Sequence, residues 1–422
     1  MQPTPSFSRY QRFVILVLAL TQFTVVLDFM VISPLGDILM KSLSLQPQAF
    51  GFAVSAYAFS AGISGLLTAG FADRFDRKKL LLFFYIGFVT GTVLCGFAHS
   101  YALLVAARIV TGLFGGVIAS VSMAIITDLF TLRQRGRVMG YVQMGFGASQ
   151  VLGIPIGLFL ANALGWEAAF WMIAGLGMIV AALIALRFRP VTAHLAVQQH
   201  KPALTHLWHT LTKGPYRLGF AATALLSIGG FMMMPFGSTF AVNNLGLTDK
   251  QLPLLFMVSG VSSLFIMPLV GRLSDRVDKF RIFTIASILM GITSVWYTNL
   301  GVTPLLPVIG LNVVMMMGIM GRMVPSAALT SAIPALEDRG AFMSVNTSLQ
   351  QIAGGVAAAI AGFIVTQPAK GLPLDHYSTL GYVTLGISLL SIWLMVGVDR
   401  LVKRKPVVTA AVDEAVILSE GY

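Results

Sequence analysis

The chain has 422 residues, of which 56% are apolar and 10% are charged, and its mean hydropathy is +0.84. Soluble globular domains carry about a quarter charged residues, so this composition excludes a soluble domain and predicts a polytopic membrane protein. The net charge of +12 is spread over several short connecting segments, which favours contact with anionic lipid over binding of nucleic acid.

Long apolar runs indicate how often the chain crosses the bilayer. A helix needs about 20 mainly apolar residues to cross roughly 30 Å of hydrocarbon. The sequence has twelve such runs, which predicts an all-α membrane protein with twelve transmembrane helices. The predicted spans are 12–35, 49–71, 80–98, 101–126, 138–161, 166–186, 216–241, 250–271, 281–299, 305–331, 340–366 and 379–402.

The basic residues predict which ends of these spans are cytoplasmic. Of 28 Lys and Arg, 23 fall in the two terminal segments and in the loops on the same side as the termini. Lys41, Lys250 and Lys370 fall on the opposite side, and Arg108 and Arg322 fall within spans. Because cytoplasmic segments are rich in Lys and Arg, we expect both termini in the cytoplasm and the chain in a plasma membrane, the inner membrane of a bacterium.

The first span carries Asp28 among apolar residues. An ionisable side chain inside a membrane span is costly and usually faces a polar cavity or a charged partner, so Asp28 is a candidate functional residue. The alternative is that Asp28 lies near enough to the interface to stay solvated and has only a structural role. Tyr57 in the second span is a candidate for lining a substrate cavity.

Two charged loops stand at corresponding places in the two halves of the chain. The first reads Ala-Gly-Phe-Ala-Asp-Arg-Phe-Asp-Arg-Lys-Lys over 69–79, and the second reads Gly-Arg-Leu-Ser-Asp-Arg-Val-Asp-Lys over 271–279, 202 residues later. One such loop is equally well explained as a solvated turn, but two copies indicate two related halves. Both loops resemble signatures of the major facilitator superfamily, although Asp76 and Asp278 stand where that family usually has its second glycine. The resemblance implies two six-helix bundles that alternate access to a central cavity.

The fourth span contains Arg108, followed by a glycine-rich run that is similar to the fourth-helix motif of this family. At 1.5 Å per residue, Asp28 and Arg108 lie at similar depths in their spans, so the two side chains can meet. A nearby Arg opposes the effect of desolvation on a carboxylate, so small rearrangements can switch its protonation, as proton coupling requires. A static ion pair that fixes the packing of the two helices is the alternative.

The charged loops are candidates for a conformational latch. In the family, an acidic residue at the end of the fourth helix pairs with basic residues of loop 2–3, and Asp128 stands at that position here. The resemblance therefore implies a latch on the cytoplasmic side, for which a solvated cluster of charges is the alternative. The latch candidates are Asp73, Arg74, Asp76, Arg77, Asp128, Asp275 and Arg276.

The fifth span resembles the antiporter motif of the family in its glycine content, but Ile154 separates Gly153 from Pro155. Small residues let helices approach closely, so Gly153, Pro155 and Gly157 are also explained by helix packing. The remaining candidates for a substrate cavity are Gln150, Asn312, Arg322 and Gln350. Arg322 would bind an anionic substrate group or an acidic gate residue, or its side chain would snorkel to the cytoplasmic interface.

The expected division is an N-terminal six-helix bundle over 1–190, a cytoplasmic linker over 191–214, a C-terminal six-helix bundle over 215–405 and a cytoplasmic tail over 406–422. The linker holds His206 and His209, which are spaced to share a metal, but no Cys or carboxylate accompanies them. We therefore expect a solvated linker without a metal site.

The sequence has no phosphate-binding Gly-x-x-x-x-Gly-Lys loop and no zinc-spaced set of Cys and His, so we expect neither an enzyme nor a cofactor. By resemblance to the drug and sugar:proton antiporter branch, which is arabinose efflux permease-like, we expect a monomer that exports a small organic solute in exchange for protons. Proton-coupled uptake or exchange of an organic anion is the second expectation, because two intramembrane Arg outnumber one carboxylate. A non-transporting receptor or scaffold is the third.

Overall fold

The computed structural model describes residues 6–68, 74–192, 195, 209–335 and 338–404, and within them the side chains of residues 132, 133 and 275 are not described. The described residues are almost entirely helical, with one isolated bridge between Thr366 and Asp375. Twelve helical segments among them are long and apolar enough to cross a membrane. The predicted all-α membrane fold with twelve transmembrane helices is confirmed.

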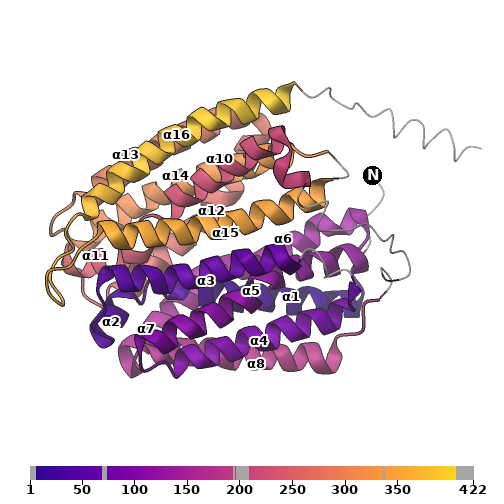
Figure 1. Ribbon diagram of the computed structural model, residues 1–422, viewed down its shortest axis with the longest axis horizontal. Coiled ribbons are helices and arrows are strands. Elements are labelled where there is room, and N and C mark those ends of the chain that lie inside the picture. The colour runs from indigo at the N-terminus through magenta and orange to yellow at the C-terminus, as the bar shows by residue number, and fades with distance from the viewer. Residues whose placement is uncertain (1–5, 69–73, 193–194, 196–208, 336–337, 405–422) are drawn as a thin grey trace, which may run out of the picture.

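The first half of the chain forms one group of six long segments, coloured indigo to magenta in Figure 1. A short helix, α2 (Gly36–Ser42), joins the first two of them. The long segments are α1 (Arg9–Val31), α3 (Pro47–Thr68), α4 (Arg77–Gly96), α5 (Tyr101–Leu129), α6 (Leu132–Ala148) continued through a π-helical turn (Ser149–Gly153) into α7 (Ile154–Leu164), and α8 (Glu167–Arg187).

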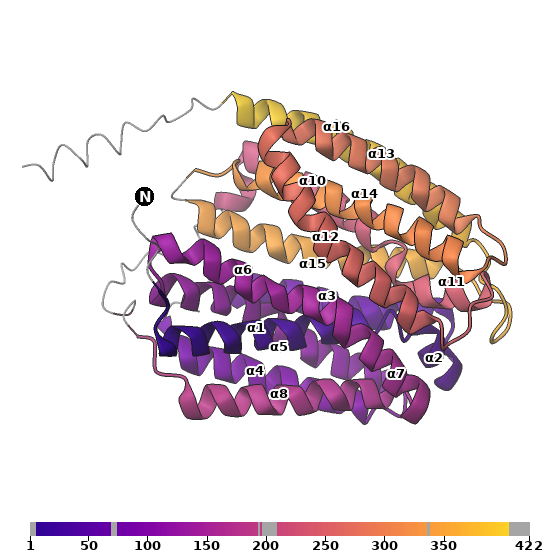
Figure 2. The same ribbon diagram turned by 180° about the vertical axis from the view of Figure 1, so that it is seen from behind.

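The second half forms another group of six, coloured pink to yellow, which lies beside the first (Figures 1 and 2). Helices α3 and α15 run side by side along the boundary between the groups, so the predicted arrangement of two six-helix bundles is confirmed. The segments are α10 (Gly214–Phe231) with its continuation α11 (Gly237–Asn243), α12 (Leu252–Arg276), α13 (Lys279–Thr298), α14 (Leu305–Ser331), α15 (Arg339–Ile364) and α16 (Tyr377–Lys403). The exact domain boundaries stay predictions, and most of the predicted linker and tail lies outside the described residues.

Two predicted spans break at equivalent prolines. The span predicted over 12–35 ends as a helix at Val31, two residues before the Ser33-Pro34 pair, and the span predicted over 216–241 breaks between Phe231 and Gly237, around Pro235. Proline has no backbone N–H and clashes with the preceding helical turn, so each long helix stops and a short one follows. Pro34 and Pro235 are 201 residues apart (235 − 34), as are the first residues of α2 and α11 (237 − 36), so the internal repeat includes the breaks.

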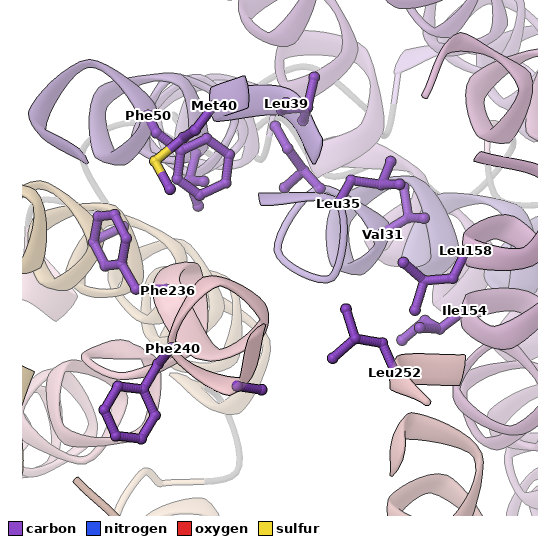
Figure 3. Close-up of a cluster of buried hydrophobic side chains, with 14 of the residues drawn as sticks. Val31, Leu35, Leu39, Met40, Phe50, Ile154, Leu158, Phe236, Phe240 and Leu252 are labelled. Carbon is purple, nitrogen blue, oxygen red and sulfur yellow. The ribbon is translucent and has the colours of Figure 1, made fainter. Parts of the chain in front are cut away.

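The hydrophobic core differs between the two ends of the molecule. At the end where α2 and α11 lie, one cluster is shared by both halves (Figure 3). It includes Val31, Leu35 and Phe50 from the first half and Phe236 and Leu252 from the second. At the other end, where α1 begins, the core divides into one cluster of the first half alone and one of the second half, against which Leu66 of α3 also packs. The halves are therefore joined by a common core at the α2–α11 end.

Candidate functional site

The first helix group buries the pair of opposite charges that the sequence singled out. Arg108 on α5 donates from Nη1 to Asp28 Oδ2 at 2.7 Å and to the Asp28 backbone carbonyl at 3.2 Å. Both side chains are 0% exposed. The structure thus brings Asp28 and Arg108 into direct contact, while a proton-coupling role for the pair stays a prediction.

The environment of the pair includes two further polar side chains. Thr92 on α4 donates from Oγ1 to Asp28 Oδ1 at 3.1 Å, and the Tyr57 ring on α3 lies under the Arg108 guanidinium at 4.6 Å. Sequence reasoning missed Thr92, because nothing in the sequence distinguishes it from Thr90 on the same helix. Arg108 Nε and Nη2 are buried and have no hydrogen-bond partner among the described residues. These donors are available to a water molecule or to a polar group of a ligand.

A row of aromatic rings leads from this pair to the other half of the molecule. The Tyr57 ring packs against Phe29 with centroids 5.2 Å apart, and Phe29 meets Phe231 of α10 edge to face at 5.8 Å. Sequence reasoning did not identify Phe29 or Phe231, because phenylalanine is common in membrane spans. Two aromatic rings, Tyr57 and Phe29, therefore lie between the Asp28–Arg108 pair and Phe231 of the second helix group.

Arg322 is the corresponding buried charge of the second half. It lies on α14 and is 2% exposed. Its Nη1 donates to Ser388 Oγ at 3.4 Å, and its Nη2 donates to the Leu226 carbonyl at 3.3 Å, so the guanidinium lies among α10, α14 and α16. Among the described residues no carboxylate pairs with it.

Two of the other cavity candidates meet on α12. Gln150, in the π-helical turn, accepts a hydrogen bond from Ser263 at 3.0 Å across the boundary between the halves. Asn312 accepts from Ser259 at 2.9 Å, one helical turn from Ser263 on the same face of α12. Gln350 is half-buried on α15. A cavity role for these residues stays a prediction.

The structure describes part of the predicted latch. Arg77 Nε lies 3.2 Å from Asp128 Oδ2, so the basic residue of the first charged loop does meet the carboxylate at the end of α5. Asp76 instead caps α4, accepting hydrogen bonds from the backbone N–H groups of Lys78 and Val191, each at 2.9 Å. Arg74 is exposed, and Asp73 lies outside the described residues.

The second charged loop repeats the capping arrangement. Asp278 caps α13 by accepting from the Arg281 backbone N–H at 3.1 Å, and it pairs with Lys403 of α16 at 2.9 Å. The hydrogen bond from Lys403 holds the pKa of Asp278 below its ordinary value. Arg276 is exposed, and the side chain of Asp275 is not described. The two aspartates that replace the usual glycine therefore serve as helix N-caps.

The small residues of the fifth span lie against α1. A Cβ on Gly153 would come within 2.7 Å of the Leu27 side chain, and one on Gly157 within 3.2 Å of Val31. Pro155 is the second residue of α7 and follows directly on the π-helical turn, where the missing N–H of proline interrupts regular α-helical hydrogen bonding. These small residues let the π-helical turn and α7 pack closely against α1 at Leu27, the residue before Asp28. A role in antiport beyond this packing stays a prediction.

Comparison with known proteins decides the family. A model of the family described as Major Facilitator Superfamily matches residues 18–358 and 220–415. The chain belongs to the major facilitator superfamily. It is therefore a multi-pass membrane protein of a transporter family, as the charged loops predicted.

Individual members of the superfamily resemble this chain at low sequence identity. The chain is 23% identical over 392 residues to the uncharacterized MFS-type transporter YceJ of Bacillus subtilis, covering 91% of this chain and 95% of that protein. It is 23% identical over 253 residues to a probable sugar efflux transporter of Helicobacter acinonychis, covering 60% of this chain and 63% of the relative. The crystal structure of a D-xylose-proton symporter superposes with a TM-score of 0.76 at 17% identity, covering 92% of this chain and 97% of that one, which shows a shared fold.

Proposed function

We propose that this member of the superfamily is a secondary transporter that exports a small organic solute in exchange for protons. The observation that carries the proposal is the fully buried contact between Asp28 and Arg108, with Thr92 on the second carboxylate oxygen. A carboxylate in the interior of a membrane protein is a default candidate for a proton relay. Its protonation would weaken the pair, and binding or release of the proton would thus change the contact between α1 and α5.

The direction of transport is inferred from a relative and from the distribution of basic residues. A similar protein is named as a probable sugar efflux transporter, which favours export over uptake. The excess of Lys and Arg on the terminal side favours an orientation with both chain ends in the cytoplasm, in which the joined α2–α11 end would face outward. In this orientation the structure would represent a state that is closed toward the outside.

The test is proton flux in liposomes loaded with a pH-sensitive dye. Wild-type protein is compared with Asp28→Asn while lipophilic cations, sugars and organic anions are offered in turn. We expect a solute that drives proton movement in the wild type and fails to do so in the variant. Asp249→Asn is the matched control, because Asp249 is exposed in a loop and its backbone carbonyl, not its side chain, accepts from Asn162. Proton flux that survives in Asp28→Asn would show that Asp28 is structural.

A second candidate function is proton-coupled uptake or exchange of an organic anion. It is favoured by Arg322, a buried guanidinium that pairs with no carboxylate among the described residues. The liposome assay separates the two candidates by the solute that moves and by the sign of the pH change. A receptor or scaffold without transport would give no flux with any solute.

A further inference from the structure

The two helix groups differ in how they neutralise their buried charge. In the first group, the Arg108 guanidinium has the Asp28 carboxylate at 2.7 Å. In the second group, Arg322 is buried to 2% exposure against a hydroxyl and a backbone carbonyl, at the long distances of 3.4 and 3.3 Å. An isolated buried charge is costly, and two weak neutral acceptors compensate poorly for lost hydration.

Among the described side chains of the second group, no carboxylate pairs with Arg322. The side chain of Asp275, in the last turn of α12, is not described. Helices α10 and α14 contain no Asp or Glu, and the same is true of α13 and α15. The acidic residue of α16, Asp399, already pairs with Lys403 at 2.8 Å. It lies eleven residues along the helix from Ser388 (399 − 388), or roughly 16 Å at 1.5 Å per residue. The charge of Arg322 is therefore left for a group that is not part of these helices.

The backbone of α10 lies directly against the Arg322 guanidinium. Gly229 and Gly230 stand opposite the guanidinium, and a Cβ on either would lie 3.5 or 3.4 Å from Arg322 Nη2. The absence of side chains at two consecutive positions leaves the α10 backbone as the neighbour of the charge. Phe231 follows directly and makes the aromatic contact with Phe29 across the boundary between the halves. The α10 residues that face Arg322 are thus followed directly by the first ring of the row formed by Phe231, Phe29 and Tyr57.

From this arrangement we propose that Arg322 binds the anionic group of the transported solute, which is an organic anion with an apolar or aromatic body. The guanidinium presents a planar fork of donors that matches a carboxylate or sulfonate in two parallel hydrogen bonds. The body of the solute packs along Phe231, Phe29 and Tyr57, toward the Asp28–Arg108 pair. This proposal rests on the proposed transport function and names the class of its solute.

The test measures binding to the purified protein in detergent, where no gradient is needed. Naphthoate is compared with naphthamide, and octanoate with octanamide, so that each pair differs in charge and keeps its apolar body. Because a hydrogen bond to a charged group is stronger than one between neutral groups, we expect each anion to bind roughly tenfold or more tightly than its amide. Arg322→Gln should abolish this preference, and Arg322→Lys, which keeps the charge and loses the fork, should retain part of it.

A second pair of variants keeps Arg322 in place. Gly230→Asp puts a carboxylate beside the guanidinium, and Gly230→Asn adds a side chain of the same size without charge. The ratio of anion to amide affinity is the readout, because an effect of bulk changes both affinities alike. We expect Gly230→Asp to lose the preference for the anion and Gly230→Asn to keep it. Equal ratios in these two variants, or no preference in the wild type for either ligand pair, would overturn the proposal.

These experiments test anion binding at Arg322 and proton-coupled transport separately, so one proposal can fail while the other stands. Asp28→Asn is expected to move no protons, whereas Arg322→Gln is expected to lose the preference for the anion, because the two side chains lie in different helix groups. Anion binding through Arg322 without proton flux in wild-type liposomes would contradict the proposed transport function and leave the anion site standing. Proton flux driven by a neutral or cationic solute, without preference for anions, would contradict the anion site alone.

Discussion

Thr92 contacts Asp28 through one hydrogen bond that depends on the charge of the carboxylate. Its hydroxyl donates to Asp28 Oδ1 at 3.1 Å and shares its proton with the Phe88 carbonyl at the same distance, while Arg108 contacts Oδ2. A donor of this kind stabilises the ionised carboxylate and disfavours its protonation. We therefore predict that Thr92 influences proton exchange at Asp28 without being the group that exchanges the proton.

The residue-scale prediction is that Thr92→Val raises the pH at which transport is half-maximal. The variant keeps the shape of the side chain and removes the donor, so the carboxylate takes up a proton more readily. A shift of roughly one pH unit is expected, because a hydrogen bond to a charged group contributes about 1.5–3 kcal/mol and one unit corresponds to about 1.4 kcal/mol. The measurement is the pH profile of solute-driven proton flux.

Thr90→Val is the control for this prediction. Thr90 is on the same helix, is exposed, and donates to the Ile86 carbonyl within the helix at 2.9 Å. Its variant should leave the profile unchanged. An unchanged profile in Thr92→Val, with normal transport, would mean that protonation of Asp28 does not limit the rate.

At the scale of helices, each charged loop has an aspartate where the superfamily usually has its second glycine, and this aspartate caps the helix that follows. Asp76 and Asp278 each cap the helix that follows, α4 and α13. Asp76 also accepts the buried N–H of Val191, a residue that follows α8, so it ties the end of the first helix group to α4. Asp278 is more exposed, with a third of its side chain accessible, and its second partner is Lys403.

We predict that Asp76→Ala lowers the midpoint of thermal unfolding more than Asp278→Ala. Loss of a cap costs about 1 kcal/mol, and an unpaired buried N–H adds about 1–3 kcal/mol at Asp76 only. The measurement is thermal unfolding in detergent at pH 7, with Asp76→Asn as the control that keeps an accepting oxygen. Equal shifts in the two alanine variants would show that the Val191 contact contributes nothing.

The contribution of Asp278 to the stability of the folded protein depends on pH in a defined way. Since its pKa is lowered in the folded protein, its stabilising effect is present above the ordinary carboxyl value of about 3.9 and is lost as the pH falls through the folded value. The difference in unfolding midpoint between wild type and Asp278→Ala should therefore be constant near neutral pH and shrink only below about pH 4.

These cases show what can be predicted from the sequence and what cannot. Asp28 and Arg108 stand out because charges are rare in apolar spans, and helix geometry placed them at equal depth. The capping role of Asp76 was not predicted, since its partner Val191 is 115 residues away and is brought close only by the fold. The contact between Phe29 and Phe231 was also missed, because nothing distinguishes a bridging phenylalanine from one that faces lipid. The helix breaks at Pro34 and Pro235 could have been found from the two prolines at the repeat distance.

At the scale of the whole molecule, the polar contacts between the halves reinforce the shared core at the α2–α11 end. Ser238 donates to the Ser33 carbonyl at 2.8 Å, and Ser33 Oγ donates to the Met234 carbonyl, so the two helix breaks bind each other. Asn243 on α11 donates to Asp37 on α2 at 2.8 Å. For a transporter that alternates access, these contacts must separate in the opposite state.

The corresponding prediction is that tethering Asp37 to Asn243 stops transport. Both residues are replaced by Cys in a Cys95→Ser background, because Cys95 is the chain's single cysteine. A short bis-methanethiosulfonate reagent, which joins two thiols through disulfides and releases sulfinate, should link them rapidly, since the Asp37 and Asn243 side chains are in hydrogen-bond contact, and should abolish solute-driven flux. Reversal of the link with a reductant should restore it.

The neighbouring residue supplies the control for the tether. Asn244 exchanges hydrogen bonds with the backbone of Leu374 at 3.0 and 2.8 Å, and both residues belong to the second half of the chain. Linking cysteines at 244 and 374 should therefore leave transport intact. Both positions lie in the second half, so the link does not hold the two halves together. Full transport with the 37–243 tether in place would mean that the α2–α11 end does not open, and that the halves move about some other contact.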